Sequence, residues 1–272
     1  MSIPREKSTE VKIGLFTVLG ALMLLLVVVI LGKERKLFEE ALSLSIKAAG
    51  AGARLLLLAL ASSDEELHIK SKEDGSLVSD ADYASDKIIT EILSPLGIPI
   101  LSEEAIIPSF EDRKDWPYYF LIDPLDGTES FLKNRSGFTV NIALIYDGNP
   151  IMGVIYVPVK EELYFAMEGL GSYKVNKNSV IENLEALISS SDKLPVNYKR
   201  KNYVIVGSRS HMSAETEVFF EQKKKEHENV EVMAVGSSLK LCMVAEGKAD
   251  AYPRYAPTME WDTGAGHAIV KY

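Results

Sequence analysis

The residues best suited to chemistry are carboxylates that follow short apolar runs. Glu103 and Glu104 follow one such run, Asp123 and Asp126 follow the next, and Asp262 begins a predicted helix. Because α/β sheets present functional groups where strands end and helices begin, we expect these side chains to converge on one cleft. Such oxygen ligands suit Mg²⁺. Two ions about 4 Å apart would stabilise the attacking and leaving oxygens of a phosphoryl transfer.

The segment DPLDGT at 123–128 favours a ligand-binding loop. Pro124 fixes the backbone of the turn, and Gly127 allows the backbone to approach a ligand closely. An ordinary surface turn with solvated acids is the alternative. Glu103 and Asp262 lie at comparable element ends, which weakens that alternative, although spacing alone leaves both interpretations open.

The composition is that of a folded acidic protein. The chain has 272 residues, 47% of them apolar and 25% charged, and 30 basic against 39 acidic side chains give a net charge of −9. This balance excludes a disordered chain. It also argues against nucleic acid as a partner, because that affinity comes from Lys and Arg neutralising phosphates. The single cysteine, Cys242, excludes an intrachain disulfide and a CxxC metal site.

Residues 13–32 form one long apolar stretch without a charge. At about 1.5 Å per residue, a helix of this length spans roughly 30 Å, the hydrocarbon thickness of a bilayer. A buried core helix is the alternative, but such helices carry a polar face and this stretch has none. We therefore predict a membrane anchor over 1–35, with its span at 13–32. Slightly more Lys and Arg follow the span than precede it, which predicts a cytoplasmic C-terminal bulk.

The remaining elements must bring the carboxylates together. Short apolar runs typical of strands cluster in the middle of the chain, and strands alternate with helices after them. This order predicts a layered α/β fold with two subdomains, 36–160 and 161–272. Helices are predicted at 36–63, 82–93, 214–228, 238–246 and 261–270, and strands at 98–101, 118–122, 138–146, 151–157, 162–167, 203–206 and 230–235.

Four segments resemble, in order, the signatures of the inositol monophosphatase superfamily. They are KEDGSLVSDAD at 72–82, LSEE at 101–104, LIDPLDGTESF at 121–131 and WDTGAGHAI at 261–269. Four more resemble its 3'(2'),5'-bisphosphate nucleotidase branch: FTVNIALI at 138–145, SRSH at 208–211, GSSLK at 236–240 and VAEGKADAYPR at 244–254. The resemblance covers roughly 36–272. It implies the layered αβαβα sandwich of sugar phosphatases, here preceded by one transmembrane helix.

Carried over residue by residue, the resemblance implies a site that holds two or three Mg²⁺ ions. Asp82, Thr128 and Glu103 would orient and deprotonate the attacking water. Gly127 and Thr128 would hold the scissile phosphate near a helix N-terminus, a favourable place for an anion. The implied metal ligands are Glu103, Asp123, the Leu125 carbonyl, Asp126 and Asp262.

The implied reaction converts adenosine 3',5'-bisphosphate into AMP and phosphate, which removes a by-product of sulfate activation. A bisphosphate needs a second cationic patch away from the metal ions, and the C-terminal half carries candidate basic residues. A surface charge is the alternative interpretation of each, and Arg209 and Arg254 are the weaker candidates. The predicted substrate contacts are Gly127, Thr128, Ser208, His211, Gly236, Lys240, Arg254 and Asp262. Inositol or other sugar phosphates are the alternative substrates, and Lys240 distinguishes the two classes.

The sequence departs from the superfamily pattern at three places. Leu77 stands where the family usually has Pro, and the subdomain 161–272 is expected to be truncated at its C-terminal end. The N-terminal anchor resembles that of the MCE family of lipid-transport proteins, with no MCE domain after it. A catalytically impaired membrane-anchored domain is therefore a further alternative. The predicted location is the bacterial inner membrane, with the catalytic part on the cytoplasmic side, and no partner protein is indicated.

Overall fold

The structure is a computed structural model of the whole chain. It describes residues 5–62, 67–72, 77–134, 137–176, 183–196, 198–207 and 213–272, with side chains from residue 32 onward. The chain divides into two units, Met1–Ala41 and Leu42–Tyr272. The predictions for Ser208, Arg209 and His211 lie outside the described residues.

The first element, α1 (Arg5–Ala59), is one uninterrupted helix. The sequence predicts a separate helix from residue 36, but residues 33–36 are Lys, Glu, Arg and Lys, which are good helix formers and provide no stop. Within the described side chains, one stretch has the length and composition of a spanning helix, Gly32–Ala59, and half of its most apolar window is buried in the protein. The core helix of a soluble protein has the same properties, so the span at 13–32 stays a prediction.

The core is a seven-stranded sheet in the order β3-β4-β5-β6-β7-β8-β9. β3 and β4 are parallel, and the other neighbours are antiparallel. The central strands are buried along nearly their whole length, as in sheets covered on both faces. The strands are β3 (Ile100–Ser102), β4 (Tyr118–Asp126), β5 (Thr139–Tyr146), β6 (Asn149–Val157), β7 (Glu162–Met167), β8 (Gly171–Asn176) and β9 (Asp192–Lys193). The sheet continues across residue 160, and the division into subdomains there stays a prediction.

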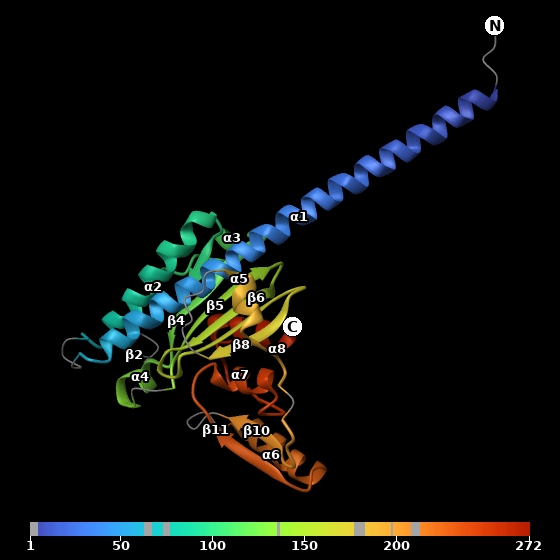
Figure 1. Cartoon of the computed structure of the whole chain (residues 1–272). Helices are drawn as coiled ribbons and strands as arrows, with labels where there is room; N and C mark the ends of the chain where they lie inside the picture. The colour runs from blue at the N-terminus through green and yellow to red at the C-terminus, as the bar shows by residue number, and fades with distance from the viewer. Residues whose placement is uncertain are drawn as a thin grey trace. The chain divides into compact units, whose positions relative to one another are not determined.

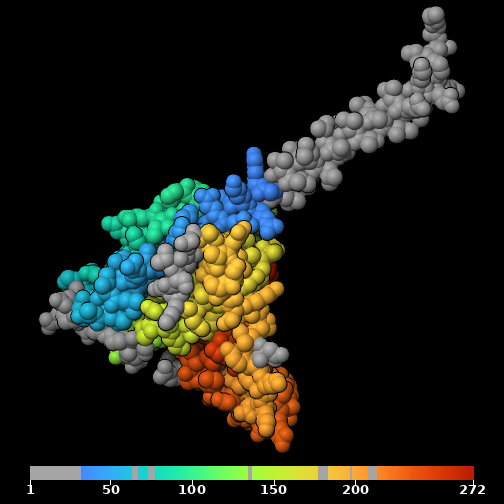
Figure 2. All heavy atoms as spheres, in the orientation of Figure 1, coloured from blue at the N-terminus to red at the C-terminus, as the bar shows by residue number. Residues whose placement is uncertain are grey.

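Helices cover both faces of this sheet (Figure 1). The part of α1 from Leu42 to Ala59 and α2 (Asp80–Leu93) lie on one face, and Figure 2 shows them as neighbouring surfaces in blue to teal. On the other face lie α7 (Leu239–Glu246) and α8 (Glu260–Lys271), whose Ala265 carbonyl comes close to Gly153 of β6. Beyond α7, the parallel pair β10 (Tyr203–Gly207) and β11 (Val230–Ala234) packs with α6 (Ala214–Glu226). The predicted layered α/β fold is therefore confirmed.

Shorter elements connect these layers. β1 (Lys70–Ser71) and β2 (Leu77–Val78) pair, and α3 (Phe110–Arg113), α4 (Thr128–Asn134) and α5 (Leu184–Ser189) are short helices. Single 3₁₀ turns occur at Ser94–Leu96 and Pro158–Lys160. The local sequence pattern does not predict α4, because it is only two turns long and directly follows a strand; the resemblance alone implied a helix N-terminus at Gly127 and Thr128.

The segment DPLD continues strand β4 instead of forming a surface turn. Asp123 pairs with Asn141 of β5 and Asp126 with Thr139, with a register shift between the two pairs. The predicted strand, 118–122, is therefore too short, because the Pro and the two acids carry no strand signal of their own. A bulge of this kind at a strand end re-aims side chains, and the interpretation as a solvated turn is wrong.

Two glycines of α1 provide a matched test of the α1–α2 contact. A Cβ on Gly52 would lie 2.6 Å from Ser85 Oγ and 3.0 Å from Ile89 Cδ1, whereas one on Gly50 would meet nothing within 4 Å. We expect Gly52→Ala to lower the free energy of unfolding by about 1–3 kcal/mol through overpacking. Gly50→Ala should raise it by about 0.5–1 kcal/mol, because Ala is the better helix former. Urea unfolding of both variants measures this, and an equal gain in both would contradict the close packing.

The C-terminal end of α7 is held by a buried polar network. Lys174 Nζ of β8 lies 3.0 Å from Glu162 Oε1 and 3.1 Å from Glu246 Oε1, the last residue of α7. The Tyr164 hydroxyl also donates to Glu246, and Tyr198 donates to its other oxygen at 3.2 Å. Removing one partner of such a network leaves a buried charge uncompensated. The network therefore fixes α7 against β7 and β8.

Candidate active site

The carboxylates converge where β3 and β4 end. Because these strands are parallel neighbours, Glu103, directly after β3, lies beside the end of β4 with its two aspartates. Asp262 joins them from the first turn of α8. Asp123 is fully buried, and burial first, then the charges of Asp126, Glu103 and Asp262, raise its pKa well above the usual range. The predicted convergence of these four carboxylates is thus present in the structure.

The protein holds Asp126 and Asp262 through one oxygen each. Oδ2 of Asp126 accepts the Ser238 backbone N–H at 2.6 Å, the Ser238 hydroxyl at 2.7 Å and Asn141 Nδ2 at 3.3 Å. Oδ2 of Asp262 accepts the Thr258 hydroxyl at 2.7 Å. Within the described residues, the Oδ1 atoms of both aspartates accept no hydrogen bond, so each keeps one oxygen for a ligand.

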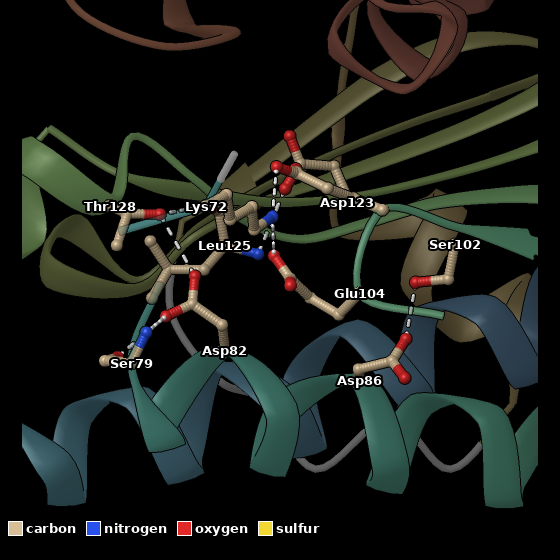
Figure 3. Close-up of polar contacts among 10 residues, drawn as sticks. Lys72, Ser79, Asp82, Asp86, Ser102, Glu104, Asp123, Leu125 and Thr128 are labelled. Carbon is tan, nitrogen blue, oxygen red and sulfur yellow. Dashed lines mark hydrogen bonds and ion pairs between the residues drawn. The ribbon is translucent and has the colours of Figure 1, made fainter. Parts of the chain in front are cut away.

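Lys72 forms ion pairs with Glu103 of the cluster and with the adjacent Glu104 (Figure 3). Its Nζ lies 2.9 Å from Glu103 Oε1 and 2.7 Å from Glu104 Oε1. Burial opposes the charge of Lys72, but its hydrogen bonds to Glu104 and Glu103 outweigh burial and raise its pKa. Burial also raises the pKa of Glu104 to about 7. Lys72 therefore compensates part of the negative charge that the site concentrates.

The cluster has the donor chemistry of a Mg²⁺ site: burial first, and then the charges of neighbouring carboxylates, raise the pKa of Glu103 and of Asp123. In the described ranges, no three His, Cys, Asp or Glu side chains stand ready to coordinate one ion.

A metal site predicts that the ion raises the thermal stability of the protein. An ion that binds only the folded state stabilises it by about 2.7 kcal/mol at a hundredfold excess over its Kd. We expect Mg²⁺ to raise the melting temperature of the full chain by several degrees, on the order of 2–4 °C per kcal/mol, and EDTA to reverse the shift. Ca²⁺ and Na⁺ at matched ionic strength control for screening, and an unchanged melting temperature would contradict a metal site.

Asp82 and Thr128, the pair predicted to act on water, are adjacent. Thr128 Oγ1 lies 3.0 Å from Asp82 Oδ1 and 3.3 Å from the Leu125 carbonyl oxygen. The Ser79 backbone N–H and hydroxyl both lie 2.7 Å from Asp82 Oδ2 (Figure 3). Burial raises the pKa of Asp82, against the hydrogen bonds from Ser79 and Thr128. The pair can therefore orient a water and accept its proton.

A cavity of about 220 Å³ opens beside Asp126 and Asp262. The predicted substrate residues Gly127, Gly236, Lys240 and Arg254 line the same cavity, although they are far apart in the sequence. Gly127 has φ of +95°, and a Cβ there would lie 3.3 Å from the Gly137 carbonyl oxygen, so glycine is required. The structure thus brings two of the carboxylates, Asp126 and Asp262, and two of the predicted basic residues, Lys240 and Arg254, to one cavity.

Two basic residues, Lys240 and Arg254, also line the cavity. Lys240 is buried, and burial lowers its pKa. Its Nζ donates to the Ser237 carbonyl at 2.6 Å and lies 5.4 Å from the centre of the Tyr252 ring. Arg254 Nε and Ser237 Oγ are buried without a hydrogen-bond partner in the described part of the chain. These unused donors suit an anionic group.

Sequence reasoning missed Ser237, Ser238 and Tyr252 as residues of the cavity. Ser237 and Ser238 lie inside the GSSLK segment that carried the resemblance, and Ser237 has φ of +48°, rare for a residue with a side chain. Tyr252 lies two residues before Arg254. The resemblance of the GSSLK segment was the signal that could have indicated the two serines. The role of each residue within that segment depends on the fold.

Comparison with known proteins identifies the family of this chain. The profile of the inositol monophosphatase family matches residues 38–271. Proteins called 3'(2'),5'-bisphosphate nucleotidase CysQ from Shigella flexneri and Escherichia coli K12 are 44% and 43% identical over 206 residues, 75% of this chain and 76% of each relative. The crystal structure of CysQ from Bacteroides thetaiotaomicron is similar with a TM-score of 0.78 and 42% identity, covering 86% of both chains. The crystal structure of the suhB protein from Bartonella henselae is similar with a TM-score of 0.64 and 26% identity, covering 85% of this chain and 84% of that chain. The chain belongs to the inositol monophosphatase family.

Proposed function

We propose that this chain is a Mg²⁺-dependent 3'(2'),5'-bisphosphate nucleotidase, which hydrolyses adenosine 3',5'-bisphosphate to AMP and phosphate. One observation carries the proposal: a single cavity is lined both by Asp126 and Asp262 of the carboxylate cluster and by the basic residues Lys240 and Arg254. An inositol monophosphate brings one phosphate and leaves the two basic residues unused. The names of the relatives at 43–44% identity support the same substrate class. In cells the reaction would remove a by-product of sulfate activation.

The ions, two or three in number, would be held by Glu103, Asp123, the Leu125 carbonyl, Asp126 and Asp262. When bound, Mg²⁺ supplies Lewis-acid stabilisation of the transferring phosphoryl group and of the leaving oxygen. Lys72 would release Glu103 for this purpose.

The protein's own groups handle the water and the phosphate. Asp82 and Thr128 hold the attacking water, and Asp82 accepts its proton with assistance from Glu103. A raised pKa makes Asp82 a better base near neutral pH. The backbone at Gly127 and the Thr128 hydroxyl hold the scissile phosphate, while Lys240 and Arg254 bind the other one. Gly236 allows close approach, and Ser208 and His211 are proposed contacts outside the described residues.

Phosphate release by the full chain tests this function. We expect release from adenosine 3',5'-bisphosphate in the presence of Mg²⁺, none in EDTA, and little from inositol 1-phosphate. Release from inositol 1-phosphate alone would identify a sugar phosphatase instead. No release from either substrate with Mg²⁺ present would favour the alternative of a catalytically impaired, membrane-anchored domain.

We also propose that residues 13–32 anchor the protein in the bacterial inner membrane, with the catalytic part on the cytoplasmic side. The uncharged composition of that stretch supports the anchor. Retention in the membrane fraction after carbonate extraction, with protease digestion of the catalytic part only in inverted vesicles, is the expected result. Extraction into the soluble fraction would contradict it.

A further inference from the structure

One face of α2 reaches three different segments of the site. Asp82, Ser85 and Asp86 have the i, i+3, i+4 spacing that places side chains on one face of a helix. Asp82 contacts the Thr128 hydroxyl as described. The Ser85 hydroxyl, fully buried, donates to the Pro124 carbonyl at 2.9 Å. Asp86 Oδ1 accepts the hydroxyl of Ser102 at 2.5 Å (Figure 3).

The contacts of Ser85 and Asp86 end beside proposed metal ligands. Ser102 directly precedes Glu103, and Pro124 lies between Asp123 and Leu125, whose carbonyl is a proposed ligand. The Glu103 backbone N–H further donates to the Ile122 carbonyl at 3.1 Å, so the two segments are already adjacent. Ser85 and Asp86 thus tie both segments to one rigid helix.

We propose that Ser85 and Asp86 are positioning residues that set the separation between Glu103 and the 123–126 ligands, and through it the affinity for the metal. The inference rests on the proposed function, since it assumes that these residues bind Mg²⁺. Groups that orient metal ligands from behind matter because a ligand shifted by a fraction of an ångström binds worse. Their loss typically weakens metal binding about 10–100-fold.

The two contacts differ in what they fix. Ser85 holds the peptide carbonyl next to Leu125, and its loss leaves the buried Pro124 carbonyl without that donor. Asp86 holds the hydroxyl at the end of β3, so it acts on Glu103 through the chain. Because Asp86 acts here as a hydrogen-bond acceptor, an Asn at this position can still accept from Ser102, whereas an Ala cannot.

Titration of the full chain with Mg²⁺, and with Mn²⁺ monitored by electron paramagnetic resonance, tests the inference without any substrate. We expect Asp86→Ala, Ser102→Ala and Ser85→Ala each to raise the metal Kd about tenfold or more. Asp86→Asn should stay within about threefold of the parent. The double variant Asp86→Ala with Ser102→Ala should bind no worse than either single variant, because both remove the same hydrogen bond. At saturating metal, the KM for the nucleotide should stay within about twofold.

Lys87→Ala is the matched control, because Lys87 is exposed on the same helix beside Asp86. Unchanged metal affinity in Ser85→Ala and Asp86→Ala would overturn the inference while leaving the proposed function intact. Equal loss in Asp86→Asn and Asp86→Ala would show that Asp86 acts through its charge and not by positioning. A parent chain that binds neither metal would overturn the proposed function and this inference together. If Asp86→Ala lowers the melting temperature markedly, the metal affinity of Ser102→Ala tests the inference instead, because that substitution removes the same hydrogen bond.

Discussion

Asp126→Asn is expected to lower kcat/KM for the nucleotide bisphosphate at least about a thousandfold while the fold survives. The donors Ser238 and Asn141 converge on one oxygen of Asp126. An Asn side chain can turn its carbonyl oxygen to these donors, which leaves its amide nitrogen where the metal would bind. Loss of one ion removes several kcal/mol of transition-state stabilisation, and about 1.36 kcal/mol corresponds to a tenfold change in rate.

Three measurements separate this effect from misfolding. Calorimetric titration should show one Mg²⁺ fewer per chain, and the metal-free melting temperature should be equal to or above that of the parent. That temperature should not fall, because the substitution removes a negative charge that burial disfavours strongly enough to raise the pKa of Asp126 despite the hydrogen bond from Ser238 and the charge of Lys240. Asp115→Asn, an exposed site with the same change of charge, is the matched control. Near-normal turnover in Asp126→Asn would show that the two-metal assignment is wrong.

The sequence predicts most of the elements that position this site, because they carry strong local patterns. The runs that become β5, β6 and β7 and the helices α2 and α8 are found within a few residues of their bounds. The end of β4 is different. Asp123 and Asp126 belong to the strand because they pair with Asn141 and Thr139 of β5, and pairing across the chain is invisible in a local pattern.

The partners of the carboxylates could not be predicted for the same reason. Glu103 meets Lys72, which is 31 residues away, and Asp126 meets Ser238, which is 112 residues away. Neither spacing follows a helical or strand period. The segments that contain these residues were recognisable by resemblance, but which atom donates to which depends on how α7 and the residues after β1 lie against the sheet ends.

The N-terminal helix shows another limit of local reasoning. The sequence places a break near residue 36 because the composition changes there from apolar to charged. Charged residues such as Lys33 and Glu34 are nevertheless good helix formers, and the backbone of α1 continues through them. A change of environment therefore need not coincide with a change of secondary structure.

Lys240→Ala is expected to raise the KM for adenosine 3',5'-bisphosphate about a hundredfold while leaving inositol 1-phosphate hydrolysis within about threefold. Lys240 is buried at the cavity, and its amine donates to the carbonyls of Ser237 and Val235. Among the described residues it makes no ion pair, so its charge is available to a second phosphate. Truncating one partner of a buried charge pair costs on the order of 2–5 kcal/mol. A monophosphate held by the metal ions does not use this charge.

The comparison of two substrates makes this prediction specific. Lys240 is the second residue of α7, and its Nζ lies over the ring of Tyr252. Truncation of this side chain can therefore also disturb the cavity wall. Such a disturbance would reduce turnover of both substrates, whereas loss of a phosphate contact reduces only that of the bisphosphate. Lys225→Ala, an exposed cation on α6, controls for net charge. Equal losses for the two substrates would contradict a second phosphate site, and the metal-bound phosphate alone would then define the substrate.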